Sequence, residues 1–172
     1  MVEVLIKGRF NLDGEWFQYS RKQGITSAEY EKLVAPEISK GGNFSYDYKG
    51  EFYSTTTVYG YIKRGDVSES YKCLLGILNS NLFWWYLVNT GTVLANAYFR
   101  FKPDYIKPFP IPAFIPKDTE LNIIEYVDKM MELKSQGAYS SNIDYEDKIN
   151  DVVYSLYALT EEDIKLIKEA TS

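Results

Sequence analysis

The spacing of the apolar residues changes near Ser70, and this change limits the chain to folds that combine strands with helices. Before it, residues 44–48 alternate aromatic and polar side chains with period two, as in a half-exposed strand. After it, large apolar residues between residues 74 and 86 recur at helical spacing on more than one face, which is typical of a buried helix. Strands followed by helices predict an α+β fold.

The predicted strands occupy the first two-thirds of the chain. They are short runs between Gly, Asp and Asn turn signals, rich in the β-branched and aromatic residues that fit a pleated surface. They cover residues 2–10, 14–19, 33–38, 44–48 and 52–62, and residues 24–32 are a candidate short helix. The sequence Lys49-Gly50-Glu51 predicts a hairpin turn between the last two strands.

The remainder of the chain is a proline-rich stretch followed by a helical end. Five prolines between residues 103 and 116 predict an extended segment rather than a helix. A helix capped by Asp118 or Thr119 is predicted next, and Thr160 and Asp163 resemble a capping box that opens the last helix. We therefore expect a β-rich domain at 1–116 that contains the buried central helix, and an acidic helical segment at 117–172.

Charge is divided unevenly along the chain. Residues 1–112 hold 13 Lys+Arg and 11 Asp+Glu, a net charge of +2, whereas residues 113–172 hold 6 and 13, a net charge of −7. Attraction to phosphate depends on the local potential rather than on the total charge. The overall charge of −5 is therefore compatible with DNA binding by the first part of the chain.

The residue types exclude several classes of enzyme. The chain has no histidine and one cysteine, Cys73, so Ser-His-Asp and Cys-His nucleophile systems and structural zinc sites are excluded. It contains no Gly-x-x-x-x-Gly-Lys phosphate loop and no Gly-x-Gly-x-x-Gly motif. A single cysteine suits a reducing compartment, and the apolar stretch after Met1 is too short for a leader. We expect a cytoplasmic, non-catalytic chain with no cofactor and no membrane span.

One loose grouping of residues leaves an enzymatic alternative open. Glu37, Asp47 and Lys49 resemble the arrangement in which two carboxylates bind a metal ion while a lysine assists the attack of water. The Gly41-Gly42 turn and the aromatic alternation explain the same residues as parts of a hairpin. A small metal-dependent nuclease is therefore an alternative to a binding module.

Basic and amide side chains at predicted strand ends and turns are the candidate contacts to DNA. Arg and Lys can bind guanine edges or phosphates, and Asn can bind adenine through two hydrogen bonds. Any one of them alone has the properties of a solvated surface residue. The candidates are Arg9, Arg21, Lys22, Lys40, Asn43, Lys49, Lys63, Arg64, Arg100 and Lys102.

Several segments, taken in order, have familiar sequences, and the most specific is Leu75-Gly76-Ile77-Leu78-Asn79-Ser80-Asn81-Leu82. The others are Gly8-Arg9-Phe10, residues 32–39, 44–47, 53–57, Ile106-Lys107-Pro108-Phe109-Pro110-Ile111-Pro112 and residues 143–164. Together they resemble the TaqI-like C-terminal specificity domain, the target-recognition domain of type IIG restriction–modification enzymes and adenine-N6 DNA methylases.

The resemblance implies a module that recognises a specific sequence of double-stranded DNA and is itself non-catalytic. In that family an S-adenosylmethionine-dependent adenine-N6 methyltransferase core precedes the domain, often with a nuclease before it, so S-adenosylmethionine and Mg are expected on those catalytic domains. The Asn-Pro-Pro-aromatic motif of the core is absent here. The chain is then a fragment or a separate subunit whose partners are DNA and a methyltransferase core. A protein-interaction subunit that docks through the acidic helical tail is a further alternative.

Overall fold

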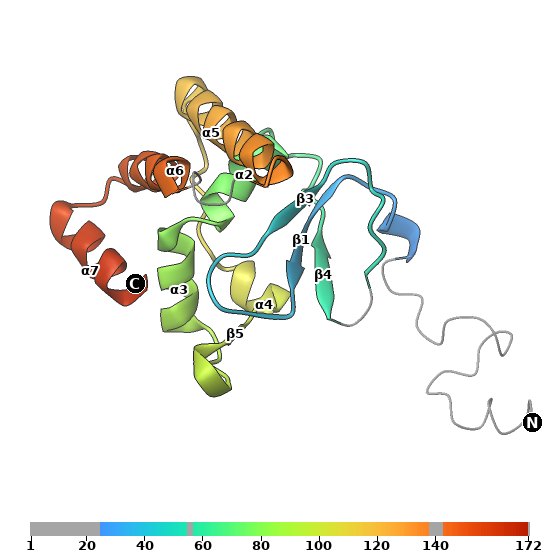
Figure 1. The fold of residues 1–172 in the computed structure, drawn as a ribbon, viewed down its shortest axis with the longest axis horizontal. Coiled ribbons are helices and arrows are strands. Elements are labelled where there is room, and N and C mark those ends of the chain that lie inside the picture. Colours follow the sequence, from blue (N-terminus) through green and yellow to red (C-terminus); the bar gives the residue numbers. More distant parts are fainter. Residues whose placement is uncertain (1–24, 55–56, 138–142, 172) are drawn as a thin grey trace, which may run out of the picture.

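The computed structural model describes residues 25–54, 57–137 and 143–171. The predicted strands at 2–10 and 14–19, with Arg9, Arg21 and Lys22, lie outside the described residues. The fold is α+β, as predicted (Figure 1). Its elements in chain order are η1 (Ile25–Ser27), β1 (Lys32–Pro36), β2 (Ile38–Ser39), β3 (Ser45–Asp47), β4 (Val58–Tyr61), α2 (Tyr71–Leu78), α3 (Asn81–Thr90), η2 (Ala95–Ala97), β5 (Phe99–Arg100), α4 (Pro103–Ile106), α5 (Lys117–Ser135), α6 (Ile143–Leu156) and α7 (Glu161–Thr171).

A three-stranded antiparallel sheet has the order β3-β1-β4, and this order corrects the predicted hairpin. Both β3 and β4 pair with β1, so Leu33 lies between Tyr46 and Tyr61. The chain does not reverse directly from β3 into β4, because the Asp47 carboxylate accepts hydrogen bonds from the backbone N–H groups at 51 and 52, each at 3.0 Å. These bonds close residues 47–52 into a loop, and β4 then enters on the other side of β1.

The predicted central helix is divided into α2 and α3. The Ser70 hydroxyl accepts a hydrogen bond from the Cys73 N–H at 3.1 Å, and the Ser80 hydroxyl accepts one from the Phe83 N–H at 3.3 Å. Each serine is therefore an N-cap, and the cap at Ser80 requires a break between the two helices. Asn79, at the break, bonds the backbone of Phe44 in both directions, at 2.9 and 3.0 Å.

Two corrections concern the proline-rich stretch. It contains the short helix α4, because Pro103 occupies the first turn, where a missing N–H costs no hydrogen bond. The next helix begins at Lys117, with Pro116 rather than Asp118 or Thr119 at its N-cap. The predicted capping box at Thr160 is confirmed: its hydroxyl accepts from the Asp163 N–H at 3.2 Å, and its own N–H donates to the Asp163 carboxylate at 2.9 Å.

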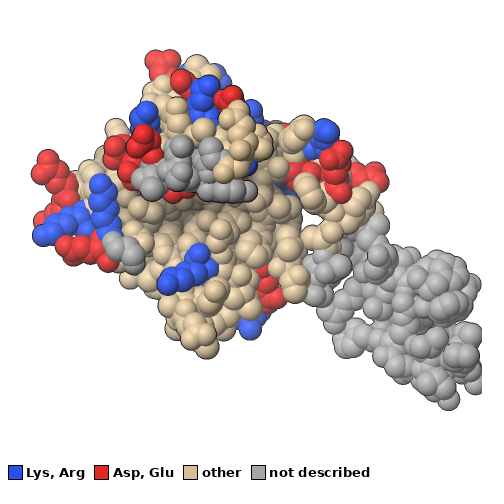
Figure 2. Space-filling model, viewed as in Figure 1, with Lys and Arg blue, Asp and Glu red and all other residues tan. Residues whose placement is uncertain are grey.

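The helical end carries much of the surface charge. Figure 2 shows acidic and basic side chains gathered over α7 and around α5, while the middle of that face, over α3 and α4, carries few. No helix in the described part of the chain is both long enough and apolar enough to cross a bilayer.

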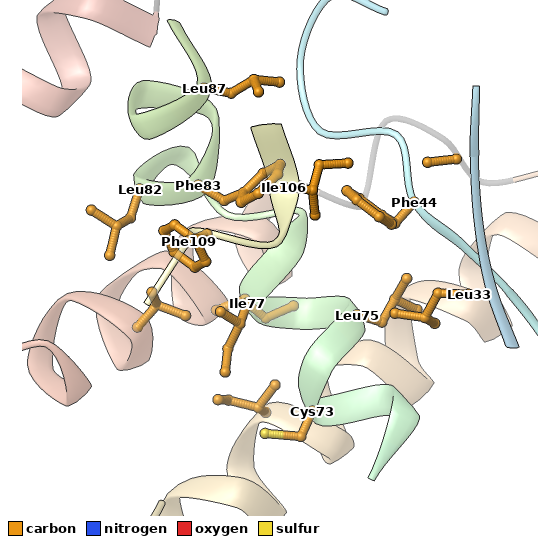
Figure 3. Packing of buried hydrophobic residues seen from close by; sticks show 14 of the residues in the cluster. Leu33, Phe44, Cys73, Leu75, Ile77, Leu82, Phe83, Leu87, Ile106 and Phe109 are labelled. Atoms are coloured by element: carbon orange, nitrogen blue, oxygen red, sulfur yellow. The ribbon is translucent and has the colours of Figure 1, made fainter. Parts of the chain in front are cut away.

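The core is continuous from the sheet into the helical end. Leu33 and Phe44 contribute from the sheet side, and Ile123 and Val153 contribute from α5 and α6 (Figure 3 shows part of this cluster). α5 packs closely against α2 at Gly76. A Cβ atom added at Gly76 would stand 2.5 Å from the Ile123 Cγ2 atom, so this close approach requires glycine. The division at residue 116 stays a prediction, but the residues after it share the core of the residues before it.

Candidate nucleic-acid interface

A two-stranded antiparallel sheet, β2 with β5, gives this part of the fold two distinct faces. Ile38 pairs with Arg100, and Ser39 pairs with Phe99. Ser39 and Phe99 are 5% and 6% exposed and point inward, whereas Ile38 is 44% exposed. Because successive side chains of a strand point to opposite faces, Arg100, which pairs with Ile38, and the residues two positions along each strand also point outward.

The outward side chains form a surface that we call the ribbon face. Lys40 is exposed, Lys102 is half-buried, and neither forms an ion pair within the described part of the chain. Arg100 donates through Nη1 to the Glu37 carboxylate at 3.0 Å, which leaves further guanidinium N–H groups for a ligand. The ribbon face consists of Ile38, Lys40, Tyr98, Arg100 and Lys102.

A tight hairpin tip, residues 92–98, leads into β5. The Leu94 N–H donates to the Tyr98 carbonyl at 2.7 Å, and Val93 bridges to Phe99. At the turn Asn96 and Ala97 both have positive φ, 61° and 59°, as in the tight turns of β-hairpins. Asn tolerates this conformation better than Ala does. In Figure 1 the tip projects from the body beyond the end of α3, next to β5.

Two asparagines near this surface differ in what their side chains do. The Asn43 amide nitrogen donates to the Ser39 hydroxyl and to the Lys40 carbonyl, the latter at 3.2 Å, so it holds its own loop together. Asn96 is exposed, and its amide has no hydrogen-bond partner among the described residues. Sequence reasoning chose Asn43 and missed Asn96. The signal that could have found Asn96 is its place between two apolar pairs, Val93-Leu94 and Tyr98-Phe99, where asparagine favours a turn.

The other predicted cations lie on different elements. Lys63 donates to the Glu69 carbonyl at 2.9 Å, and Arg64 pairs with Asp66 at 3.1 Å. These two cations line a groove of about 480 Å³ together with Lys107 and the apolar residues after α4. Lys49 pairs with Glu51 at 3.7 Å. Of the predicted residues, the structure therefore brings Lys40, Arg100 and Lys102 together on one face, beside Asn43, and places Lys49, Lys63 and Arg64 outside it.

The three residues of the nuclease alternative each have a separate partner in the fold. Glu37 pairs with Arg100, and Lys49 pairs with Glu51. Asp47 is 3% exposed and accepts a hydrogen bond from the Lys32 ammonium at 2.5 Å. Burial alone would raise the pKa of Asp47, but the bonds from Lys32 and from two backbone N–H groups outweigh it and hold the pKa below its usual value. Among the described residues, no group of three His, Cys, Asp or Glu side chains is placed to hold a metal ion.

Comparison with known proteins gives a match to one family. No curated protein sequence matches the chain. The family described as the TaqI-like C-terminal specificity domain matches residues 6–111, more than half of the 172 residues, and this match includes the ribbon face and the hairpin tip. The chain therefore belongs to the family of TaqI-like C-terminal specificity domains, which serve target recognition in restriction–modification enzymes.

Proposed function

We propose that the chain recognises a short sequence of double-stranded DNA by placing the ribbon face and the hairpin tip against the duplex. The observation that carries this proposal is the outward face of β2 and β5. There Lys40 and Lys102, which form no ion pair among the described residues, stand beside exposed Ile38 and Tyr98. The major groove admits a two-stranded ribbon of this kind. The cations attract the phosphate groups, and the projecting hairpin tip extends from the domain toward the duplex.

Each group has a role that its chemistry supports. Lys40 and Lys102 bind phosphate oxygens and set the position of the domain on the duplex. Arg100, held by Glu37, turns its remaining N–H groups to a guanine edge, and Tyr98 packs against sugar or base. Asn96 binds an adenine edge, because its amide carries both the donor and the acceptor that adenine requires.

In this proposal the chain supplies recognition and another part of the enzyme supplies chemistry. The sequence has no Asn-Pro-Pro-aromatic motif, with which an adenine-N6 methylase holds the flipped base, so adenine methylation falls to a separate methyltransferase core in the cytoplasm that binds S-adenosylmethionine. A nuclease activity with Mg belongs, on the same reasoning, to a further catalytic domain. The recognition domain holds one side of the duplex while the core extrudes the target base.

Selection from a pool of randomised duplexes tests the proposal. We expect the full chain to enrich one short sequence and to bind it more tightly than an unrelated duplex, with an affinity that falls as salt rises. A pool that stays random after repeated selection would overturn the proposal.

Asn96→Gly is expected to relax the preference at one base pair of the selected sequence by about 1–3 kcal/mol. Glycine adopts positive φ at no cost, so this substitution removes the amide and keeps the turn. Fluorescence anisotropy with the selected duplex and its single-base variants measures the change. Asn122→Ala, at an exposed position of α5, is the matched control and should leave every preference intact. Unchanged selectivity in Asn96→Gly would show that the tip does not read a base.

A further inference from the structure

A second surface of the domain combines exposed aromatic rings with carboxylates. Tyr30, Tyr48, Phe52 and Tyr53 are 59%, 59%, 64% and 66% exposed. Around them lie three exposed glutamates. We call this surface the aromatic–acidic patch, and it consists of Glu29, Tyr30, Glu31, Tyr48, Glu51, Phe52 and Tyr53.

Hydrogen bonds hold the two segments of the patch side by side. The Tyr53 hydroxyl donates to the Glu29 carboxylate at 2.6 Å, and the Tyr46 hydroxyl donates to Glu31. A Cβ at Gly50 would stand 2.1 Å from the Glu29 carbonyl oxygen, so the loop approaches as closely as glycine allows. The Tyr53 ring and the two backbone segments of the patch are therefore held in place before any partner arrives, which lowers the entropic cost of binding.

The charge of the patch is opposite to that of the ribbon face. Two lysines lie next to it in the described structure. The Lys49 ammonium pairs with Glu51 and lies 5.5 Å from the centre of the Tyr48 ring, whereas the buried Lys32 ammonium, 3.4 Å from the Tyr30 carbonyl oxygen, is paired with Asp47. Because Asp47 balances Lys32, the three glutamates against Lys49 leave the patch negative. It repels phosphate and anionic headgroups, and it attracts cations.

We propose that the aromatic–acidic patch docks a protein surface that presents arginine side chains. Clusters of exposed apolar side chains mark interaction sites, and tyrosine is enriched in protein interfaces. A planar guanidinium stacks on an aromatic ring while it binds a carboxylate through two hydrogen bonds, which the ammonium of lysine cannot do. This docking is independent of DNA recognition and leaves the ribbon face open.

The test uses the full chain and a twelve-residue peptide of alternating Arg and Gly, followed by backbone amide NMR. We expect chemical shift changes at residues 29–31 and 48–53, with weaker binding of a Lys-Gly peptide of equal charge. Phe52→Ala and Glu51→Gln should each weaken binding by about two- to five-fold. Phe114→Ala, which removes a ring that is 77% exposed outside the patch, and Glu125→Gln on α5 are the matched controls and should leave the affinity unchanged.

Three results would overturn the proposal. The first is a set of peptide-induced changes confined to the acidic helices α6 and α7. The second is an equal loss of affinity in Phe52→Ala and Phe114→Ala. The third is occupation of the patch by another class of ligand. A DNA duplex or anionic vesicles would then change the chemical shifts of residues 48–53. If the ligand is a second copy of the chain, the native chain would sediment as a dimer and Phe52→Ala as a monomer.

Discussion

Asp47→Ala is expected to lower the free energy of unfolding by about 3–5 kcal/mol, because it leaves the Lys32 ammonium buried without its counter-ion. The Lys32 and Asp47 side chains are 4% and 2% exposed and lie 2.5 Å apart. The substitution also removes the carboxylate that accepts hydrogen bonds from the N–H groups at 51 and 52. These hydrogen bonds close the loop after β3 in the native chain. Urea unfolding followed by circular dichroism measures the loss.

The matched control is Asp66→Ala, which breaks an ion pair of the same type at the surface. The Arg64 and Asp66 side chains are 82% and 68% exposed, so this pair contributes about 0–1 kcal/mol. Equal losses of stability in the two variants would show that the pair between Lys32 and Asp47 is not a buried, stabilising one.

The pH dependence of stability gives a second measure of the same pair. The pKa of Asp47 is lower in the folded chain than its usual value. A lowered folded pKa contributes stability that is fully present above the unfolded pKa, about 4, and is lost as pH falls through the folded pKa. The native chain should therefore lose more stability than Asp47→Asn as pH falls from about 5 to below 4. Parallel stability curves for the two proteins would contradict this assignment.

Phe101→Ala is expected to cost about 3–5 kcal/mol, because it opens a cavity where the ribbon joins the core. Phe101 is 0% exposed, and its ring centre lies 5.9 Å from that of Phe44 and 6.3 Å from that of Phe83. The same unfolding measurement applies, with Phe114→Ala as a control that removes an exposed ring. A cost below about 1 kcal/mol would mean that β5 is not anchored through this side chain.

Arg100, next to Phe101 in the chain, gives the complementary comparison. Its side chain points outward and forms a half-exposed ion pair with Glu37, so its contribution to stability is small. Phe101 directly follows β5, and the alternation of the extended chain sends its side chain into the core and that of Arg100 outward, where our proposal places the DNA.

Features that depend on local chemistry were predictable from the sequence. The capping box at Thr160 and Asp163 requires only residues three apart, and the helical spacing of the apolar residues after Ser70 identified the buried helices. The order β3-β1-β4 was not predictable in this way, because the Asp47 loop displaces the expected hairpin. The break at Ser80 was also missed, because the apolar pattern continues across it.

The candidate interface was predictable in its residue types and not in its arrangement. Lys40, Arg100 and Lys102 were recognised as possible contacts, but they share a face only because β2 pairs with β5 from a distant part of the chain. Asn43 fits a turn that could reach DNA, yet its amide nitrogen is used by its own loop. The exposed position of the Asn96 amide depends on a backbone conformation that the sequence does not specify.

The salt dependence of duplex binding tests the role of the ribbon face most directly. The triple variant Lys40→Gln, Arg100→Gln, Lys102→Gln is compared with a control triple variant, Lys129→Gln, Lys134→Gln, Lys165→Gln, in α5 and α7. If the ribbon face contacts phosphates, the triple variant should reduce the slope of log K against log salt concentration by about 0.9 for each phosphate contact removed. The control variant should keep the native slope. Equal slopes and affinities in the native chain and the ribbon variant would contradict the assignment of DNA recognition to this face.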